Sequence, residues 1–188
     1  MTATRSLLEF REARAGYTHP VVGPVSFSVN AGEVLGLSGV NGVGKTTLLK
    51  LIGDGARLFG GELRRAADLS VAHHRQRPER PPELPLVGRE VLEMAGALQA
   101  ARAPRLEQLA ARCLDEMSGG EFQLLQAWAC LAGPAKLVLL DEPTNNLDQE
   151  AIELLLEEIK RLPPDRAVLL VSHDTPFLQT ACDRIVQL

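Results

Sequence analysis

Long apolar runs, aromatic residues and cysteines are all scarce in this sequence of 188 residues. No apolar stretch reaches the length of about eighteen residues that a membrane-spanning helix needs. The first five residues lack the apolar core of a signal peptide. The three cysteines are far apart and lie among apolar neighbours, which indicates free thiols in a reducing compartment, and no spacing typical of a metal site occurs.

The charge balance excludes another broad class. Twenty Lys and Arg residues against 24 Asp and Glu give a formal net charge of -4. Such a chain has no general attraction for nucleic acid or anionic lipid, so we expect no direct contact with nucleic acid. The length is that of one domain with a substantial core, and we treat residues 1–188 as a single domain.

What the sequence does contain is a glycine-rich loop with a specific spelling. It reads Gly39, Val40, Asn41, Gly42, Val43, Gly44, Lys45, Thr46, Thr47. A loop that directs several backbone N–H groups at one polyphosphate needs glycines. The lysine would bring positive charge to the β- and γ-phosphates, and Thr46 would be a ligand of the accompanying Mg²⁺. The alternative is a glycine-rich turn that binds nothing.

The flanks of this loop favour the phosphate-binding interpretation. Residues 33–38 form a short apolar run typical of a buried strand, and 46–52 carry leucines and an isoleucine at helical spacing up to Gly53. A strand, a glycine loop and a helix in this order direct the helix N-terminus at a phosphate.

The rest of the chain predicts an α/β fold. Alternating residues at 25–29 indicate a half-buried strand in an antiparallel flank over 7–30. Apolar runs predict further strands at 69–72, 137–142, 167–172 and 183–188, and a helix runs from Asp148 to about 161. Strands that alternate with helices are typical of a parallel sheet.

A different composition marks the middle of the chain. Four prolines within 77–85 exclude regular structure there and indicate a joint. Residues 86–116 are rich in Ala, Leu, Glu and Arg and predict about two helices, the second beginning at Pro104. We therefore expect a small helical sub-domain at approximately 84–130, inserted into a core made of 1–83 and 131–188.

Ser118, Gly119, Gly120 and Glu121 begin the next helix, and their pattern has two interpretations. A serine with a glutamate three residues later forms a capping box, which needs no ligand. Two glycines in a first turn, however, cost up to ~1 kcal/mol each relative to alanine if they count as interior positions. Bare backbone at a helix start suits close approach of an anion.

Polar residues follow three predicted strands. Lys45 follows the first, Asp141 and Glu142 end the second, and His173 follows the third. A solvated turn or a surface histidine would explain each alone, but the carboxyl ends of parallel strands share one edge, where ligands bind. Hydrolysis of ATP there would use Asp141 for Mg²⁺, Glu142 for the attacking water and His173 for the γ-phosphate.

The order of these motifs resembles that of an ABC-type ATPase, a nucleotide-binding domain of the ATP-binding-cassette superfamily. The resemblance covers nearly the whole chain and implies a phosphate-loop (RecA-like) parallel core with a shortened helical sub-domain. It implies these further roles: Tyr17 stacks on adenine, although on its own a tyrosine packed in its loop would be the favoured interpretation. Gln76 senses Mg²⁺, Ser118, Gly119 and Gly120 bind the ATP of the opposite protomer, and Asp148 contacts that protomer. Two ATP molecules would then lie between two copies, or between this chain and a related cassette.

Departures from the family pattern affect the predicted coupling surface. Met117 replaces the usual leucine, Glu121 the usual glutamine, and Leu124 stands where an arginine is expected. The interval 77–117 is also short for the helical sub-domain. The catalytic residues are intact, so we expect turnover.

Two classes within the superfamily fit the sequence. The first is a transporter motor, cytoplasmic and peripheral on the inner face of the membrane, docked on separate transmembrane permease subunits. The second is a soluble ABC-F-like factor acting on the ribosome. The motifs at 145–148, 172–174 and 177–178 resemble those of that class. The single cassette and the acidic balance favour the transporter motor.

Overall fold

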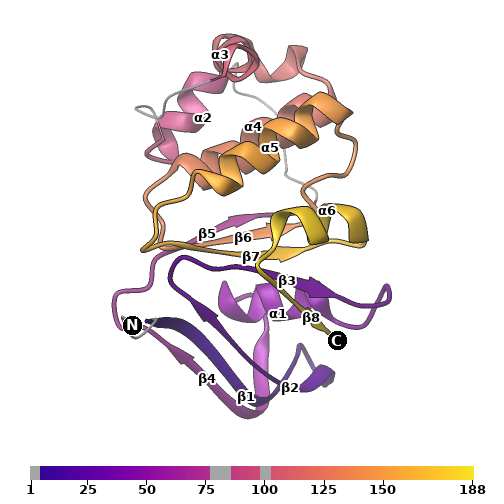
Figure 1. Ribbon diagram of the computed structural model, residues 1–188. Coiled ribbons are helices and arrows are strands. Elements are labelled where there is room, and N and C mark those ends of the chain that lie inside the picture. The colour runs from indigo at the N-terminus through magenta and orange to yellow at the C-terminus, as the bar shows by residue number, and fades with distance from the viewer. Residues whose placement is uncertain (1–4, 77–85, 98–102) are drawn as a thin grey trace.

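The computed structural model describes residues 5–76, 86–97 and 103–188, which form two sheets and a layer of helices (Figure 1). The strands are β1 (Ser6–Gly16), β2 (Pro20–Asn30), β3 (Val34–Ser38), β4 (Arg57–Arg65), β5 (Val71–His74), β6 (Leu137–Asp141), β7 (Ala167–Val171) and β8 (Arg184–Gln187). The helices are α1 (Lys45–Ile52), α2 (Gly88–Met94), α3 (Pro104–Ala111), α4 (Gly119–Ala132), α5 (Gln149–Lys160) and α6 (Thr175–Ala181), with a 3-10 turn at Leu114–Glu116. The predicted proline-rich joint, 77–85, lies outside the described residues.

Five parallel strands form the central sheet in the order β5-β6-β7-β3-β8, which confirms the predicted fold class. The register aligns the carboxyl ends of neighbouring strands. Val171 of β7 pairs with Leu37 on one side and with Asp141 on the other. The loops that follow β3, β6 and β7 therefore leave the sheet from the same edge.

The central strands are apolar on both faces because each face covers a different core. In β6, Leu137 and Leu139 belong to the core shared with α1 and the antiparallel sheet, whereas Val138 and Leu140 face the helical layer. Figure 1 shows α1 between the two sheets and α2 to α6 on the other side of the parallel sheet. A strand buried on both faces reads as an unbroken apolar run.

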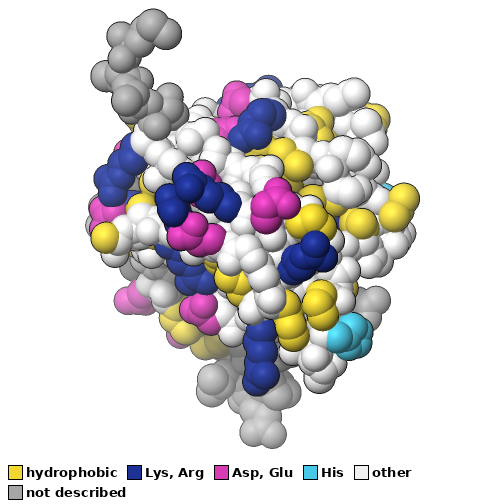
Figure 2. Space-filling model, turned by 90° about the horizontal axis from the view of Figure 1, so that it is seen from below, with side chains coloured by type: hydrophobic (Ala, Val, Ile, Leu, Met, Phe, Trp, Pro, Cys, Tyr) yellow, Lys and Arg dark blue, Asp and Glu magenta, His cyan; other side chains and the backbone are white. Residues whose placement is uncertain are grey.

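The antiparallel sheet has the order β2-β1-β4. Strands β1 and β2 confirm the flank predicted over 7–30. Strand β4 was not predicted, because its exposed side chains are mostly charged and follow no apolar alternation. It pairs with β1 so that Arg64 lies opposite Glu9 and Glu62 opposite Arg11. Figure 2 shows the molecule from below, where positive and negative side chains are interspersed on the surface.

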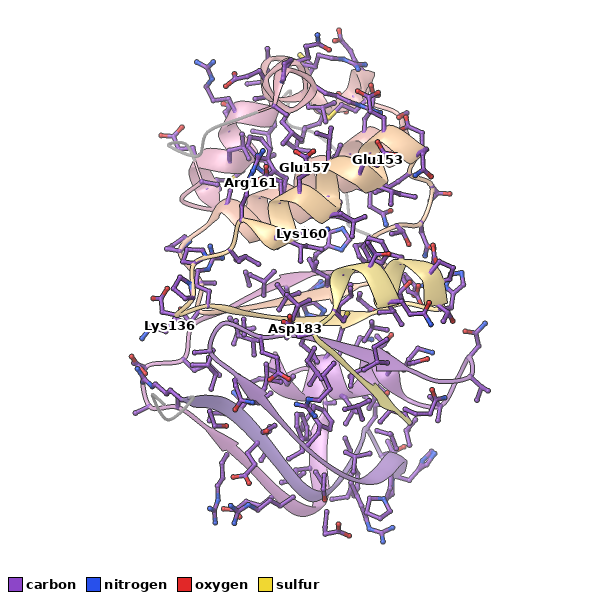
Figure 3. All side chains as sticks on the ribbon, viewed as in Figure 1. Lys136, Glu153, Glu157, Lys160, Arg161 and Asp183 are labelled. Carbon is purple, nitrogen blue, oxygen red and sulfur yellow. The ribbon has the colours of Figure 1, made fainter. Side chains whose placement is uncertain are left out.

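The helical layer contains the two helices predicted within 86–116, and α3 begins at Pro104 as expected. Helix α5 buries Ala151, Leu155 and Ile159 and presents Glu153 and Glu157 to solvent (Figure 3). Side chains of α2, α3 and α4 pack in one core with β6 and β7. The boundaries of the helical sub-domain, at approximately residues 84 and 130, stay a prediction.

Two further elements differ from the sequence-based expectation. Strand β5 begins two residues later than predicted, at Val71. Helix α6 was not predicted; it is short, and Asp174 caps it by accepting a hydrogen bond from the Phe177 N–H. Within the described part of the chain, no helix has both the length and the apolar character needed to cross a bilayer.

Candidate active site

The start of α1 is open to an incoming anion. Gly44 precedes the helix with φ 105°, and no side chain caps its first turn. A Cβ at Gly44 would lie 2.4 Å from the Val22 Cβ, so both backbone conformation and space require glycine. The first N–H groups of an uncapped helix have no intrahelical acceptor, and they are available for phosphate oxygens.

The Lys45 ammonium lies inside the loop. Its Nζ donates hydrogen bonds to the carbonyl oxygens of Gly39 (2.7 Å) and Val40 (3.2 Å), and the side chain is buried. These neutral acceptors hold the ammonium group of Lys45 at the N-terminus of α1. A phosphate oxygen is a stronger partner for this charge, so the lysine is already placed for a triphosphate.

Asp141 ends β6 beside the loop. Its Oδ1 accepts a hydrogen bond from the Thr46 hydroxyl at 3.2 Å, and only 2% of the residue is exposed. Burial raises the pKa of Asp141, and the Thr46 hydrogen bond opposes that rise. A divalent cation would favour the ionised form.

The donor set at this point fits Mg²⁺. Among the described residues no three His, Cys, Asp or Glu side chains cluster as a metal-binding group. Magnesium is usually held by one or two carboxylates together with substrate phosphates and water, and not by an all-protein cage. The Thr46 hydroxyl and the Asp141 carboxylate match this requirement.

Glu142 has an unusual backbone and a fixed side chain. Its φ is 49°, in the left-handed region that a non-glycine residue rarely adopts. Its Oε2 accepts a hydrogen bond from the His173 N–H (3.2 Å) and lies 2.7 Å from the His173 Nδ1. Its carbonyl oxygen accepts a hydrogen bond from the buried Gln123 Nε2 (3.0 Å). Strain held in place by surrounding contacts is typical of active sites.

A cavity of about 380 Å³ joins these groups. It brings together most of the residues predicted from the sequence, in addition to Val21 and Val171. The predicted residues that line it are Asn41, Gly42, Gly44, Lys45, Thr46, Thr47, Gln76, Glu142 and His173. Asp141 does not line this cavity but a neighbouring groove of about 400 Å³, which shares Thr46 and Gln76 with it.

Other predicted residues lie away from the cavity lining. Tyr17 is 42% exposed, and the Lys50 ammonium lies 5.6 Å from the centroid of its ring. Gly39 contributes the carbonyl that binds Lys45, and Val43 lines a separate hollow formed with β2 and β8. Ser118, Gly119, Gly120 and Asp148 are absent from the lining.

The structure explains most of the residue types found at the start of α4. Ser118 and Glu121 form the predicted capping box, with the Ser118 Oγ accepting from the Glu121 N–H (3.2 Å). A Cβ at Gly120 would lie 2.2 Å from the Asn146 carbonyl oxygen, so packing requires that glycine. At Gly119 a Cβ would meet nothing within 4 Å, and packing does not explain this second glycine.

One departure from the family pattern, at Leu124, has a packing explanation. Met117 and Leu124 are both buried in the core of the helical layer. An arginine at position 124 of this chain would place a charge in that core. Glu121, in contrast, remains partly accessible and ionised, because hydrogen bonding from the Ser118 backbone lowers its pKa.

Sequence reasoning missed two residues whose side chains hydrogen-bond to predicted site residues. Gln123, a buried polar residue on an otherwise apolar helix face, fixes the Glu142 carbonyl. Arg105 of α3 donates hydrogen bonds to both carboxylate oxygens of Asp148, at 2.9 and 2.6 Å. This guanidinium lowers the pKa of Asp148 to about 2, while the Asp148 Oδ1 also caps α5 through the Ala151 N–H.

His74 makes stability depend on pH. Burial lowers the pKa of this histidine from 6.5 to about 4. The folded state therefore binds a proton less readily than the unfolded state, so stability is complete above pH 6.5 and is lost as pH falls toward 4. The shift corresponds to about 3 kcal/mol of unfolding free energy. We expect His74→Val to remove most of this loss.

Urea unfolding of the chain without nucleotide or Mg²⁺, at pH 7.5 and 4.5, measures that difference. His19→Asn, at an exposed histidine, is the matched control and should retain the loss shown by the unsubstituted chain. An equal loss of stability in His74→Val would show that another group causes the acid sensitivity.

Comparisons with known proteins bear on the family and the fold of this chain. The family profile described as ABC transporter matches residues 22–145. The zinc import ATP-binding protein ZnuC of Paracoccus denitrificans is 34% identical over 179 residues, covering 89% of this chain and 69% of the relative. The ribosome protection protein VmlR of Bacillus subtilis is 33% identical over 164 residues, covering 86% of this chain and 27% of VmlR. A solved ATP-binding subunit of an ABC transporter superposes with a TM-score of 0.75 at 26% identity, covering 97% of this chain and 85% of that structure.

Proposed function

The chain belongs to the ABC transporter family of ATP-binding domains, and from this premise we propose that it works as a nucleotide-sandwich dimer on separate membrane subunits. The chain is the ATP-binding and ATP-hydrolysing subunit of an ABC transporter. One observation supports the site assignment most strongly: the carboxylate of Glu142, held by His173, lines the same cavity as Lys45 and the open start of α1.

The residues of the cavity divide the work of hydrolysis. Lys45 and the N–H groups of α1 bind the β- and γ-phosphates and stabilise the charge that develops there. Glu142 orients the attacking water and accepts its proton. The backbone N–H and the ring of His173 hold that carboxylate in place. Mg²⁺, held by Thr46, Gln76 and Asp141, would neutralise phosphate charge.

The remaining predicted residues suit a role in the opposite site. Ser118, Gly119 and Gly120 open a helix of 14 residues, and they do not line this chain's own cavity. An uncapped or glycine-rich helix start attracts phosphate. We assign these residues to the ATP of a second copy or of a related cassette, with Asp148 at the contact between the two.

The neighbouring groove suits a membrane partner. It is lined by Lys50, His73 and Arg75 and reaches Gln76 and Asp141, which also belong to the nucleotide site. A permease segment seated there would sense the occupied site through Gln76. The chain would then be cytoplasmic, on the inner face of the membrane. Zinc is the first cargo to assay, because the relative ZnuC is named for zinc import.

An action on the ribosome is the second candidate. VmlR, a relative of the same identity range, is named for ribosome protection, and the loop at 145–148 resembles that class. The match covers only 27% of VmlR, and the net charge of -4 suits ribosomal RNA poorly.

Affinity purification distinguishes the two candidates. A tagged Glu142→Gln variant, purified with ATP from detergent-solubilised cells of its own host, should retain a membrane protein with several spans. Lys45→Ala, which is expected to lose ATP, is the matched control and should retain less of it. Ribosomes in place of a membrane protein would support the second candidate and contradict the first.

A further inference from the structure

The first turn of α4 contains a charge that opposes the role proposed for it. A helix N-terminus has a partial positive charge of about half a unit, which favours a bound anion. Glu121, the third residue of this helix, adds a full negative charge one residue after Gly120. Without compensation, this carboxylate would repel the triphosphate of a partner protomer.

The structure shows how both oxygens of that carboxylate are engaged. Oε2 accepts a hydrogen bond from the Ser118 N–H at 2.8 Å, which completes the capping box. Oε1 lies 2.6 Å from the Nη1 of Arg112, the C-cap residue that follows α3. The Nη2 of the same guanidinium donates to the Glu116 carbonyl oxygen. Arg112 is therefore anchored at two points beside the helix start.

We propose that Arg112 is a positioning residue for the ATP of the partner protomer, which cancels the charge of Glu121 and holds its carboxylate back against the helix start. The inference rests on the proposed function, in which Ser118, Gly119 and Gly120 meet that nucleotide. With the pair formed, the first turn has no net side-chain charge. The exposed N–H at Gly119 then keeps its attraction for phosphate.

The shape of the side chain explains why an arginine serves here. A guanidinium presents several N–H donors in a rigid fork, so one group binds the carboxylate and the Glu116 carbonyl together. Both charged side chains are about one third exposed, at 37% for Arg112 and 27% for Glu121. An ion pair this accessible adds little to folding stability, so its loss should affect nucleotide-driven association more than unfolding.

The test measures ATP-driven dimerisation in the Glu142→Gln background by sedimentation velocity over a range of ATP concentrations with Mg²⁺. Arg112→Ala should raise the ATP concentration for half-maximal dimer by about tenfold, because it leaves the charge of the Glu121 carboxylate uncompensated beside the triphosphate. In a background that also contains Glu121→Gln, Arg112→Ala should change this concentration by less than about twofold. Arg161→Ala, which removes an arginine paired with two glutamates on α5, is the matched control.

Two further measurements exclude a purely structural role. Raising the salt concentration should shrink the deficit of Arg112→Ala, because screening weakens repulsion between exposed charges. Arg112→Lys keeps the charge and should recover most of the dimer. An equal deficit of Arg112→Ala with and without Glu121→Gln would overturn the inference, as would an unchanged ATP requirement. Absence of an ATP-dependent dimer in the Glu142→Gln reference would overturn the proposed nucleotide sandwich, on which the inference rests.

Discussion

Glu142→Gln is expected to lower kcat for ATP hydrolysis by about 10²- to 10⁴-fold, the usual contribution of a positioned general base. The amide cannot accept the proton of the attacking water, yet it has nearly the same size as the carboxylate. Lys45 and the α1 N–H groups are untouched, so the affinity for ATP should remain. The product-forming step alone is blocked, and the dimer with ATP and Mg²⁺ should accumulate.

Steady-state hydrolysis and sedimentation measure the two consequences separately. Glu153→Gln removes a carboxylate from the exposed face of α5 and should hydrolyse ATP at the unsubstituted rate. A Glu142→Gln variant with that same rate would contradict the assignment of the base. A variant that loses turnover but stays monomeric with ATP and Mg²⁺ would contradict the sandwich alone.

Lys45→Ala should have a second large effect, on binding as well as turnover. The ammonium is the buried cation at the phosphate loop, and charged hydrogen bonds of this kind contribute about 1.5–3 kcal/mol, so the Kd for ATP should rise by about 10- to 100-fold. Hydrolysis should fall to background because the γ-phosphate loses its charge partner.

Titration with a fluorescent ATP analogue measures the Kd directly. Lys160→Ala removes an exposed lysine from α5 and is the matched control. The loop carbonyls of Gly39 and Val40 also lose their donor in Lys45→Ala, so thermal unfolding should be recorded alongside. Unchanged ATP affinity in a folded Lys45→Ala variant would show that the triphosphate binds elsewhere.

The sequence was sufficient to place the polar residues at the ends of the parallel strands. Lys45, Asp141 and His173 could be placed at one edge because parallel strands align their carboxyl ends, a rule that needs no knowledge of side-chain packing. The two caps, at Ser118 and Asp148, were also predictable, since a cap bonds to a backbone N–H only three residues away.

Contacts between distant segments could not be predicted in this way. The bond from Gln123 to the Glu142 carbonyl and the ion pair of Arg105 with Asp148 depend on how α3 and α4 pack on the sheet. Nor does anything local in the sequence mark Arg112 as the partner of Glu121. Strand β4 was missed for a related reason: its pairing with β1 includes charges opposite one another, where sequence reasoning looks for apolar alternation.

The two-sided burial of β6 and β7 has a mechanical consequence. Helix α1, which directly follows the phosphate loop, belongs to one core, whereas α4, which Ser118 caps, belongs to the other. The parallel sheet separates the two cores, and Glu142 lies at its edge, directly after β6. A tilt of the helical layer relative to the sheet would move the start of α4. The phosphate loop and α1 would keep their arrangement, as in a shear between packed layers. If the start of α4 binds the nucleotide of a second copy, as proposed above, the contacts to the two nucleotides come from cores packed on opposite faces of one sheet.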